Sequence, residues 1–150
     1  MRYKLGRLSF IATIILCISP SFAFDPIEII DHRQNEMKFA QNLVRNIKAG
    51  LLDQNTSEAF TSARELGDWS HNLEALFPEG SEASMQNLSS ASAAIWENPQ
   101  AFDKAINMTQ NQITKLIRAL STGDFKEAMI INNGLTMTYR ACYQGFRNGF

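Results

Sequence analysis

Hydrophobic residues recur every three or four positions along most of the chain after residue 24, which is typical of amphipathic helices. The first stretch begins at Asp25-Pro26, a capping side chain followed by proline, and Gly50 marks its expected end. This pattern predicts a helix over residues 25–50. Its apolar face carries one basic side chain among the residues Ile30, Arg33, Met37, Ala40, Val44, Ile47 and Leu51.

Three more stretches show the same spacing, and each starts with a side chain that can accept hydrogen bonds from the first free N–H groups of a helix. These capping residues are Asn55, Asn98 and Asp124. Glycine, proline or serine follows each stretch where the apolar spacing stops, as expected for helix ends. The pattern predicts helices over residues 55–77, 98–120 and 124–146.

Residues 78–98 are rich in serine and alanine and have little periodicity. We expect a long connection there, with one short helical turn anchored by Ile95 and Trp96. No stretch of useful length alternates between apolar and polar residues as a strand does, and no repeat is present. The sequence therefore predicts an all-α fold, a single antiparallel four-helix bundle over residues 24–150.

The first 23 residues have the three parts of a secretory signal peptide. Three basic residues come first, the apolar run Leu8–Ile18 follows, and Ser21-Phe22-Ala23 supplies small residues at the expected cleavage site. The apolar run is too short to cross a membrane as a helix. We expect export, cleavage near Ala23 and no membrane insertion afterwards.

The charge balance changes when this segment is removed. The whole chain of 150 residues has 14 basic and 15 acidic residues, a net charge of −1. Residues 1–23 contain three basic and no acidic residues, so the rest has 11 against 15, a net charge of −4. Nucleic-acid binding by bulk charge is excluded. The single remaining cysteine, Cys142, excludes a disulfide scaffold and is either a buried thiol or a link to another chain.

Four stretches of the chain carry a family resemblance: His32–Met37, Ala94–Phe102, Thr122–Phe125 and Thr138–Arg147. Together they resemble the cytochrome c prime family, in order and spacing, over residues 25–147. The last of them resembles the helix that carries C-x-x-C-H in that family, and it is also similar to cytochrome b562. The resemblance implies a haem-binding bundle in the periplasm and a homodimer formed through the first two helices.

The chain departs from the family at the haem-attachment motif. In the place of C-x-x-C-H stands Tyr139-Arg140-Ala141-Cys142-Tyr143, so one thioether cysteine and the histidine ligand are replaced by tyrosines. A covalent c-type haem needs its axial ligand. We therefore expect no covalent haem, and we predict a haem-free, non-enzymatic module that binds an unidentified small ligand or a periplasmic protein.

The resemblance also places the family's haem site on six residues of this chain: Arg33, Met37, Tyr139, Cys142, Tyr143 and Arg147. Three outcomes stay open for that site, and one of them is a different ligand in a reshaped pocket. The aromatic stripe of Tyr139, Tyr143 and Phe146 is expected to close the cavity, because natural interiors tolerate few voids. The alternative is a non-covalent haem b in electron transfer or small-gas binding. Its iron would be held by Tyr143 and Met37, and Arg140 or Arg147 would stabilise the phenolate.

Arg33 lies on the apolar face of the first helix, where an unpaired charge is costly to bury. We expect its side chain to reach out to solvent near the end of the bundle. The alternative is that Arg33 faces an anion. That anion would be an internal carboxylate, Glu36 or Asp31, or the haem propionate that the resemblance implies.

Other chemistry has little support in the sequence. His32, His71 and five methionines are residues of types that bind copper, which makes a copper-binding periplasmic protein a third hypothesis. The methionines have no clustered spacing, however, and we assign no metal ligand. The sequence contains no catalytic motif, so we predict that the protein is not an enzyme.

Overall fold

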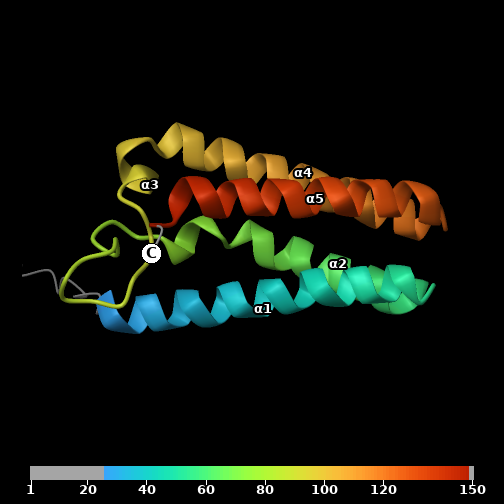
Figure 1. Cartoon of the computed structure of the whole chain (residues 1–150), viewed down its shortest axis with the longest axis horizontal. Coiled ribbons are helices and arrows are strands. Elements are labelled where there is room, and N and C mark those ends of the chain that lie inside the picture. The colour runs from blue at the N-terminus through green and yellow to red at the C-terminus, as the bar shows by residue number, and fades with distance from the viewer. Residues whose placement is uncertain (1–25, 149–150) are drawn as a thin grey trace, which may run out of the picture.

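The computed structural model describes residues 26–148, and these residues form five α-helices and one short 3-10 helix (Figure 1). The signal peptide, the Asp25 cap and the cleavage site all lie outside the described residues. The helices are α1 (Pro26–Leu52), α2 (Thr56–His71), η1 (Glu74–Leu76), α3 (Ala94–Glu97), α4 (Pro99–Ser121) and α5 (Phe125–Phe146).

The four long helices form an antiparallel bundle, which confirms the predicted fold (Figure 1). Short turns join α1 to α2 and α4 to α5, and the long connection over residues 72–98 carries the chain from α2 to α4. The α1–α2, α2–α4 and α4–α5 pairs pack extensively, whereas α1 and α5 pack against each other much less. The bundle is therefore loosest between its first and last helices.

The predicted helix starts are confirmed where the structure describes them. The side-chain oxygen of Asn55 accepts a hydrogen bond from the Glu58 amide at 3.2 Å, and Asn98 and Asp124 accept equivalent bonds three residues ahead. These bonds satisfy N–H groups that a helix leaves free at its first turn. The predicted helical turn near Ile95 is present as α3.

The first helix ends at Leu52 and not at Gly50 as predicted. Gly50 remains helical and buried, and its lack of a side chain allows the start of α2 to approach closely. A Cβ atom at residue 50 would lie 2.9 Å from the backbone nitrogen of Ala59. The chain instead reverses one turn later, where Gln54 has a positive φ of 55°.

The second helix is shorter than predicted, because α2 ends at His71 and the chain tightens into η1. The carbonyl of Leu76 accepts a hydrogen bond from the Arg33 guanidinium, and that of Phe77 accepts one from the Trp96 indole. Side chains from α1 and α3 therefore bind the carbonyls at the end of η1.

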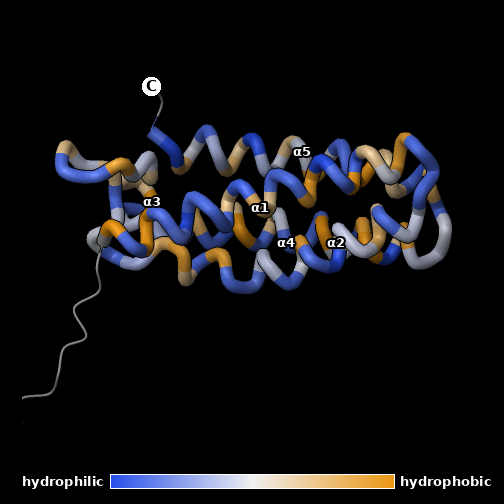
Figure 2. Tube along the Cα trace, turned by 90° about the horizontal axis from the view of Figure 1, so that it is seen from below, coloured by the Kyte–Doolittle hydropathy of each residue, from blue (hydrophilic) through white to orange (hydrophobic). Residues whose placement is uncertain are grey.

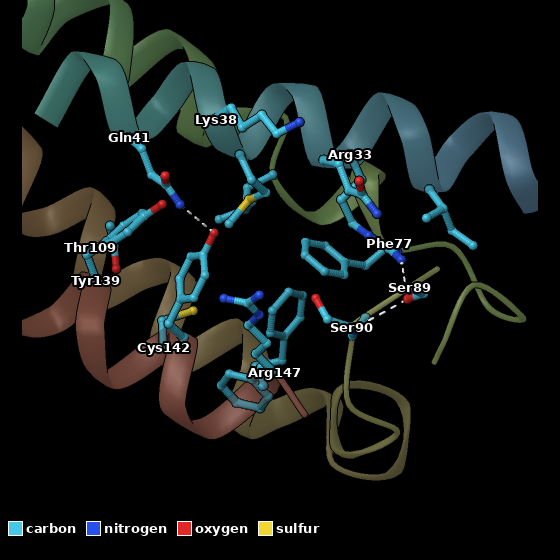
Figure 3. A pocket seen from close by; sticks show the side chains of 18 of the residues that line it. Arg33, Lys38, Gln41, Phe77, Ser89, Ser90, Thr109, Tyr139, Cys142 and Arg147 are labelled. Atoms are coloured by element: carbon cyan, nitrogen blue, oxygen red, sulfur yellow. Dashed lines mark hydrogen bonds between the residues drawn. The ribbon is translucent and has the colours of Figure 1, made fainter. Parts of the chain in front are cut away.

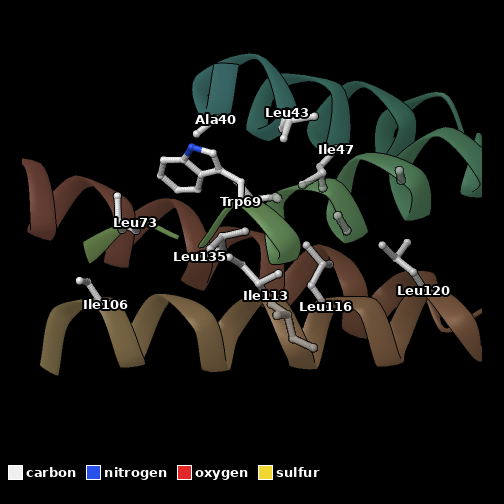
Figure 4. Close-up of a cluster of buried hydrophobic side chains, with 14 of the residues drawn as sticks. Ala40, Leu43, Ile47, Trp69, Leu73, Ile106, Ile113, Leu116, Leu120 and Leu135 are labelled. Atoms are coloured by element: carbon white, nitrogen blue, oxygen red, sulfur yellow. The ribbon is translucent and has the colours of Figure 1, made fainter. Parts of the chain in front are cut away.

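Apolar and polar positions alternate along each long helix (Figure 2), and the apolar ones meet in a core between the helices (Figure 4). The core includes Ile47, Leu66, Ile113, Leu116 and Leu135, all almost completely buried. At one end of the bundle, the start of α1, the end of α5 and the long connection come together. In the described part of the chain, no helix is both long and apolar enough to cross a membrane.

The close approach at Gly50 reverses the usual effect of replacing a helical glycine by alanine. Gly50→Ala should lower the free energy of unfolding by about 1–3 kcal/mol, because the added methyl group overpacks against α2. Gly134→Ala is the matched control in α5, where the new Cβ atom would meet only the flexible Gln112 side chain, 3.5 Å away. The control should raise the free energy of unfolding by about 0.5–1 kcal/mol. Urea denaturation of both variants checks this, and equal effects would contradict it.

Candidate functional site

A pocket of about 580 Å³ opens at the end of the bundle where the long connection crosses (Figure 3). Side chains of α1 form one wall, those of α5 form the opposite wall, and residues of the connection form the rim. Most of the lining is apolar and aromatic. The residues with a candidate role, or with contacts that shape the site, are Arg33, Gln34, Met37, Lys38, Gln41, Phe77, Ser89, Tyr139, Cys142, Tyr143, Phe146 and Arg147.

The prediction that aromatic side chains close this cavity is wrong. Tyr139, Tyr143 and Phe146 all line the pocket, but their rings pack against its walls. The Phe146 ring meets the Phe102 ring edge-on at 5.1 Å, and the two tyrosine rings lie 5.1 Å apart, tilted against each other. Because each ring has a neighbour on the wall, the space between α1 and α5 stays open.

The charged side chains that line the pocket all have the same sign. Arg33, Lys38 and Arg147 contribute three positive charges, and no aspartate or glutamate is among the described residues of the lining. This contrasts with the chain as a whole, which carries a net charge of −1. The site is therefore suited to an apolar ligand that also carries negative charge.

Arg33 is buried, with 5 % of its surface exposed, so the prediction that it reaches solvent is wrong. It pairs with neither Glu36 nor Asp31, and its four hydrogen bonds go to neutral oxygens of Leu76, Ser81 and Ser89. The guanidinium also lies over the Phe77 ring, 4.9 Å from its centre. Burial lowers the pKa of Arg33. The long connection, which follows α2, supplies most of the oxygens that permit this burial.

The two tyrosines of α5 have different surroundings. The hydroxyl of Tyr143 accepts a hydrogen bond from the Gln41 amide at 2.9 Å, which links α5 to α1, and the Arg147 guanidinium lies 5.6 Å from the Tyr143 ring centre. The buried Tyr139 hydroxyl has no hydrogen-bond partner of acceptable geometry. Burial, and to a lesser extent the neighbouring Tyr143, raise the pKa of Tyr139 well above its ordinary value.

Cys142 lies between these tyrosines in sequence and lines the same pocket, with its side chain half-buried and its thiol free. Burial raises the pKa of this thiol. The thiol is therefore a weak nucleophile at neutral pH. It is neither fully buried in the bundle nor displayed on the outer surface, so it fits neither of the two predicted states fully.

The structure brings together all six residues predicted for the site: Arg33, Met37, Tyr139, Cys142, Tyr143 and Arg147. By contrast, His32 and His71 are exposed, and neither lines this pocket. Among residues 26–148, no group of three or more histidine, cysteine, aspartate or glutamate side chains could hold a metal ion.

Sequence reasoning missed Lys38, Gln41 and Ser89. Gln41 follows Met37 by four residues, so helical spacing alone could have placed both on the same face of α1. Ser89 had no local signal, because its position depends on how the long connection folds over Arg33.

Comparison with known proteins agrees with this geometry. The family model described as cytochrome c' matches residues 28–147. Cytochrome c' of Rhodospirillum rubrum is 26 % identical over 127 residues, covering 83 % of this chain and 85 % of the relative.

Solved structures match the fold. One is a cytochrome c' with a ligand-controlled dimer dissociation, with a TM-score of 0.77 and 17 % identity over 85 % of this chain and 99 % of that one. Another is a nitric oxide complex of a cytochrome c prime variant from Alcaligenes xylosoxidans, with a TM-score of 0.75 and 20 % identity over 87 % of this chain and all of that one.

The prediction of a haem-free module is overturned by these comparisons. The matching family model and the curated relative are both cytochromes, which are haem proteins, and one solved structure has nitric oxide bound. The prediction relied on the altered attachment motif and on the expectation that the aromatic stripe of α5 closes the cavity. It gave too little weight to the other walls of the pocket, which remain open and cationic.

The raised pKa values on α5 predict a loss of stability in alkali. In the unfolded chain Cys142 and Tyr139 lose protons near their ordinary pKa values of 9.0 and 10.0, whereas the folded chain retains those protons to higher pH. The free energy of unfolding should therefore fall as the pH rises above about 9. Tyr139→Phe should make the fall above pH 10 shallower, as measured by urea denaturation at several pH values.

At neutral pH, loss of the hydroxyl group should affect the free energy of unfolding differently at Tyr139 and at Tyr143. Tyr139→Phe removes a hydroxyl with no partner and should leave stability unchanged or raise it. Tyr143→Phe removes the hydrogen bond to Gln41 and should lower the free energy of unfolding by about 1 kcal/mol. An alkaline loss that is the same with and without Tyr139 would contradict the assignment.

Proposed function

The chain belongs to the cytochrome c' family, and we propose that it is a non-enzymatic haem protein that holds a b-type haem without thioether bonds. The pocket between α1 and α5 is the proposed site, and electron transfer or the binding of a small gas is the proposed role. One observation carries the proposal: an open, largely apolar pocket lined by three cations and by no described carboxylate.

The size and the walls of the pocket fit haem, a flat apolar ring that carries two carboxylates. A volume of about 580 Å³ lies within the range of pockets that bury cofactors. Phe77, Phe102 and Phe146 form a connected set of edge-on aromatic pairs at the pocket wall. Such a wall favours an apolar ring over water.

The positive charges of the pocket lining suit the two carboxylates of haem. Arg33 is buried with only neutral hydrogen-bond acceptors around it, so a carboxylate in the pocket would be the first negative charge to reach it. Charge-assisted hydrogen bonds of this kind are about twice as strong as neutral ones. Lys38 and Arg147 add positive charge to the lining.

Tyr143 and Met37 are the proposed iron ligands, from α5 and α1. Tyrosine and methionine both serve as axial ligands in haem proteins. The Gln41 amide donates to the Tyr143 hydroxyl, and the Arg147 guanidinium lies over the Tyr143 ring. Tyr139 is the poorer candidate, because burial raises its pKa. When bound, haem supplies an iron centre that changes oxidation state and takes up small gases.

Two further proposals concern location and assembly. The basic start, short apolar run and small residues before position 24 support export to the periplasm. A homodimer through α1 and α2 is supported by the dimer named for one structural relative. It is also supported by the partly exposed Phe39 on α1.

A haem titration of the purified exported protein tests the proposed function. We expect a Soret band to form with about one haem per chain and to be removed by acid-acetone extraction, since the first cysteine and the histidine of the attachment motif are replaced by Tyr139 and Tyr143. A band that resists extraction would show covalent attachment and overturn the b-type assignment. A silent titration would overturn haem binding itself.

Replacement of the proposed ligand tests the role of Tyr143. Tyr143→His should tighten ferric haem binding by about tenfold or more at pH 7, because imidazole binds iron while neutral and a phenol must first lose its proton. Gln144→His is the matched control, since residue 144 is the exposed neighbour and does not line the pocket. Titrations of both variants should separate them, and equal affinities would rule out iron ligation from position 143.

A further inference from the structure

One stretch of the long connection is fastened to the bundle at both of its ends, and we call residues 81–91 the strap. At its far end, backbone bonds tie it to the end of α5, from the Ser92 amide to Phe146 and from the Asn148 amide to Ser90. At its near end, Ser81 accepts two hydrogen bonds from the Arg33 guanidinium, each 2.8 Å long. The strap therefore spans the pocket between α1 and α5.

Arg33 also holds the middle of the strap, through Ser89. The second terminal nitrogen of Arg33, Nη2, donates to the Ser89 hydroxyl at 2.8 Å (Figure 3). That hydroxyl also accepts a hydrogen bond from the Ala91 amide at 3.1 Å and donates to the Ser81 carbonyl at 3.0 Å. Between these two serines the strap has little packing, since Met85 and Leu88 are 99 % and 86 % exposed. Residues 82–88 are therefore held mainly by polar contacts. The Asn87 side chain bonds within the loop, to Glu82, Ser84 and Ser89, and the Gln34 side chain of α1 donates to the Leu88 carbonyl at 3.1 Å.

The two serines differ in their access to the pocket. Ser81 is fully buried and does not line the pocket, whereas Ser89 is half-buried and does. Arg33 forms no hydrogen bond from Nε among the described residues, so Nε and Nη2 together offer the paired N–H groups that a carboxylate prefers. A carboxylate that binds both must replace an acceptor on Nη2, and Ser89 is the one within reach of the pocket.

We propose that the strap is a lid that responds to negative charge in the pocket. Without a ligand, Arg33 holds the lid closed through Ser89. A ligand carboxylate takes the place of the Ser89 hydroxyl on Arg33 and so loosens residues 82–90, while Ser81 keeps the guanidinium in position. The bonds from Gln34 to Leu88 and from Asn148 to Ser90 keep the loosened strap attached to the bundle. This inference rests on the proposed function in one respect, that the ligand is a macrocycle bearing carboxylates.

Hydrogen exchange with two forms of the ligand tests the lid. Haem should speed exchange of the amides of residues 82–90 by about tenfold, the effect of losing one hydrogen bond to a charged group. Haem dimethyl ester, which has the same ring without the charges, should bind without speeding exchange. Equal effects of the two forms, or slower exchange with both, would overturn the lid. If neither form binds, the proposed function is wrong. The experiment on the protein without ligand, described next, then tests whether Arg33 holds the strap through Ser89.

The protein without ligand tests the fastening on its own. Ser89→Ala should speed exchange of residues 82–90 by a similar factor, because it removes the hydroxyl that Arg33 holds. Ser84→Ala is the matched control within the strap, since the Ser84 hydroxyl only accepts a bond from the Gln86 amide and makes none with Arg33. If the amides of residues 82–90 exchange at the same rate in Ser89→Ala and Ser84→Ala, Arg33 does not hold the strap through Ser89, even if haem binds.

Discussion

The burial of one positive charge organises the end of the bundle that holds the pocket. A guanidinium cannot be taken out of water unless its N–H groups find acceptors, and α1 has none to offer on its apolar face. The acceptors come from the chain that follows α2: the Leu76 carbonyl, both oxygens of Ser81 and the Ser89 hydroxyl. One of these acceptors is the carbonyl at the end of η1, and the others lie on the long connection. Because Arg33 binds them, the connection crosses the bundle and forms the rim of the pocket.

The pocket persists because the side chains that replaced the attachment motif have partners on the walls. Tyr143 reaches Gln41 on α1 and therefore links the two loosely packed helices. Phe146 joins Phe102 and Phe77 in a connected aromatic wall. The tyrosines at positions 139 and 143 thus leave the cavity open. Its lining offers the phenol groups of these tyrosines, the Met37 thioether and three positive charges.

Much of the fold could be predicted from the sequence, because the interactions that set it are local. The caps at Asn55, Asn98 and Asp124 act within three residues of each helix start. The spacing of apolar residues likewise fixes which face of each helix turns inward. The end of α2 could not be predicted in this way. The side chain of Gln110, forty residues later in the chain, binds the Ser70 carbonyl at 2.9 Å, which a continuing helix would use for the Glu74 amide.

The sequence by itself determined the four helices, the class of fold and six of the residues that line the candidate site. Helix periodicity and the order of the family's motifs need no knowledge of long-range packing. Only the tertiary structure decided whether the cavity closed, where Arg33 pointed and which serine faced the pocket. Those outcomes depend on contacts between segments far apart in the chain, such as Arg33 with Ser89 and Gln41 with Tyr143. A buried charge accepts any arrangement that satisfies its hydrogen bonds, and the path of the folded chain selects one of them.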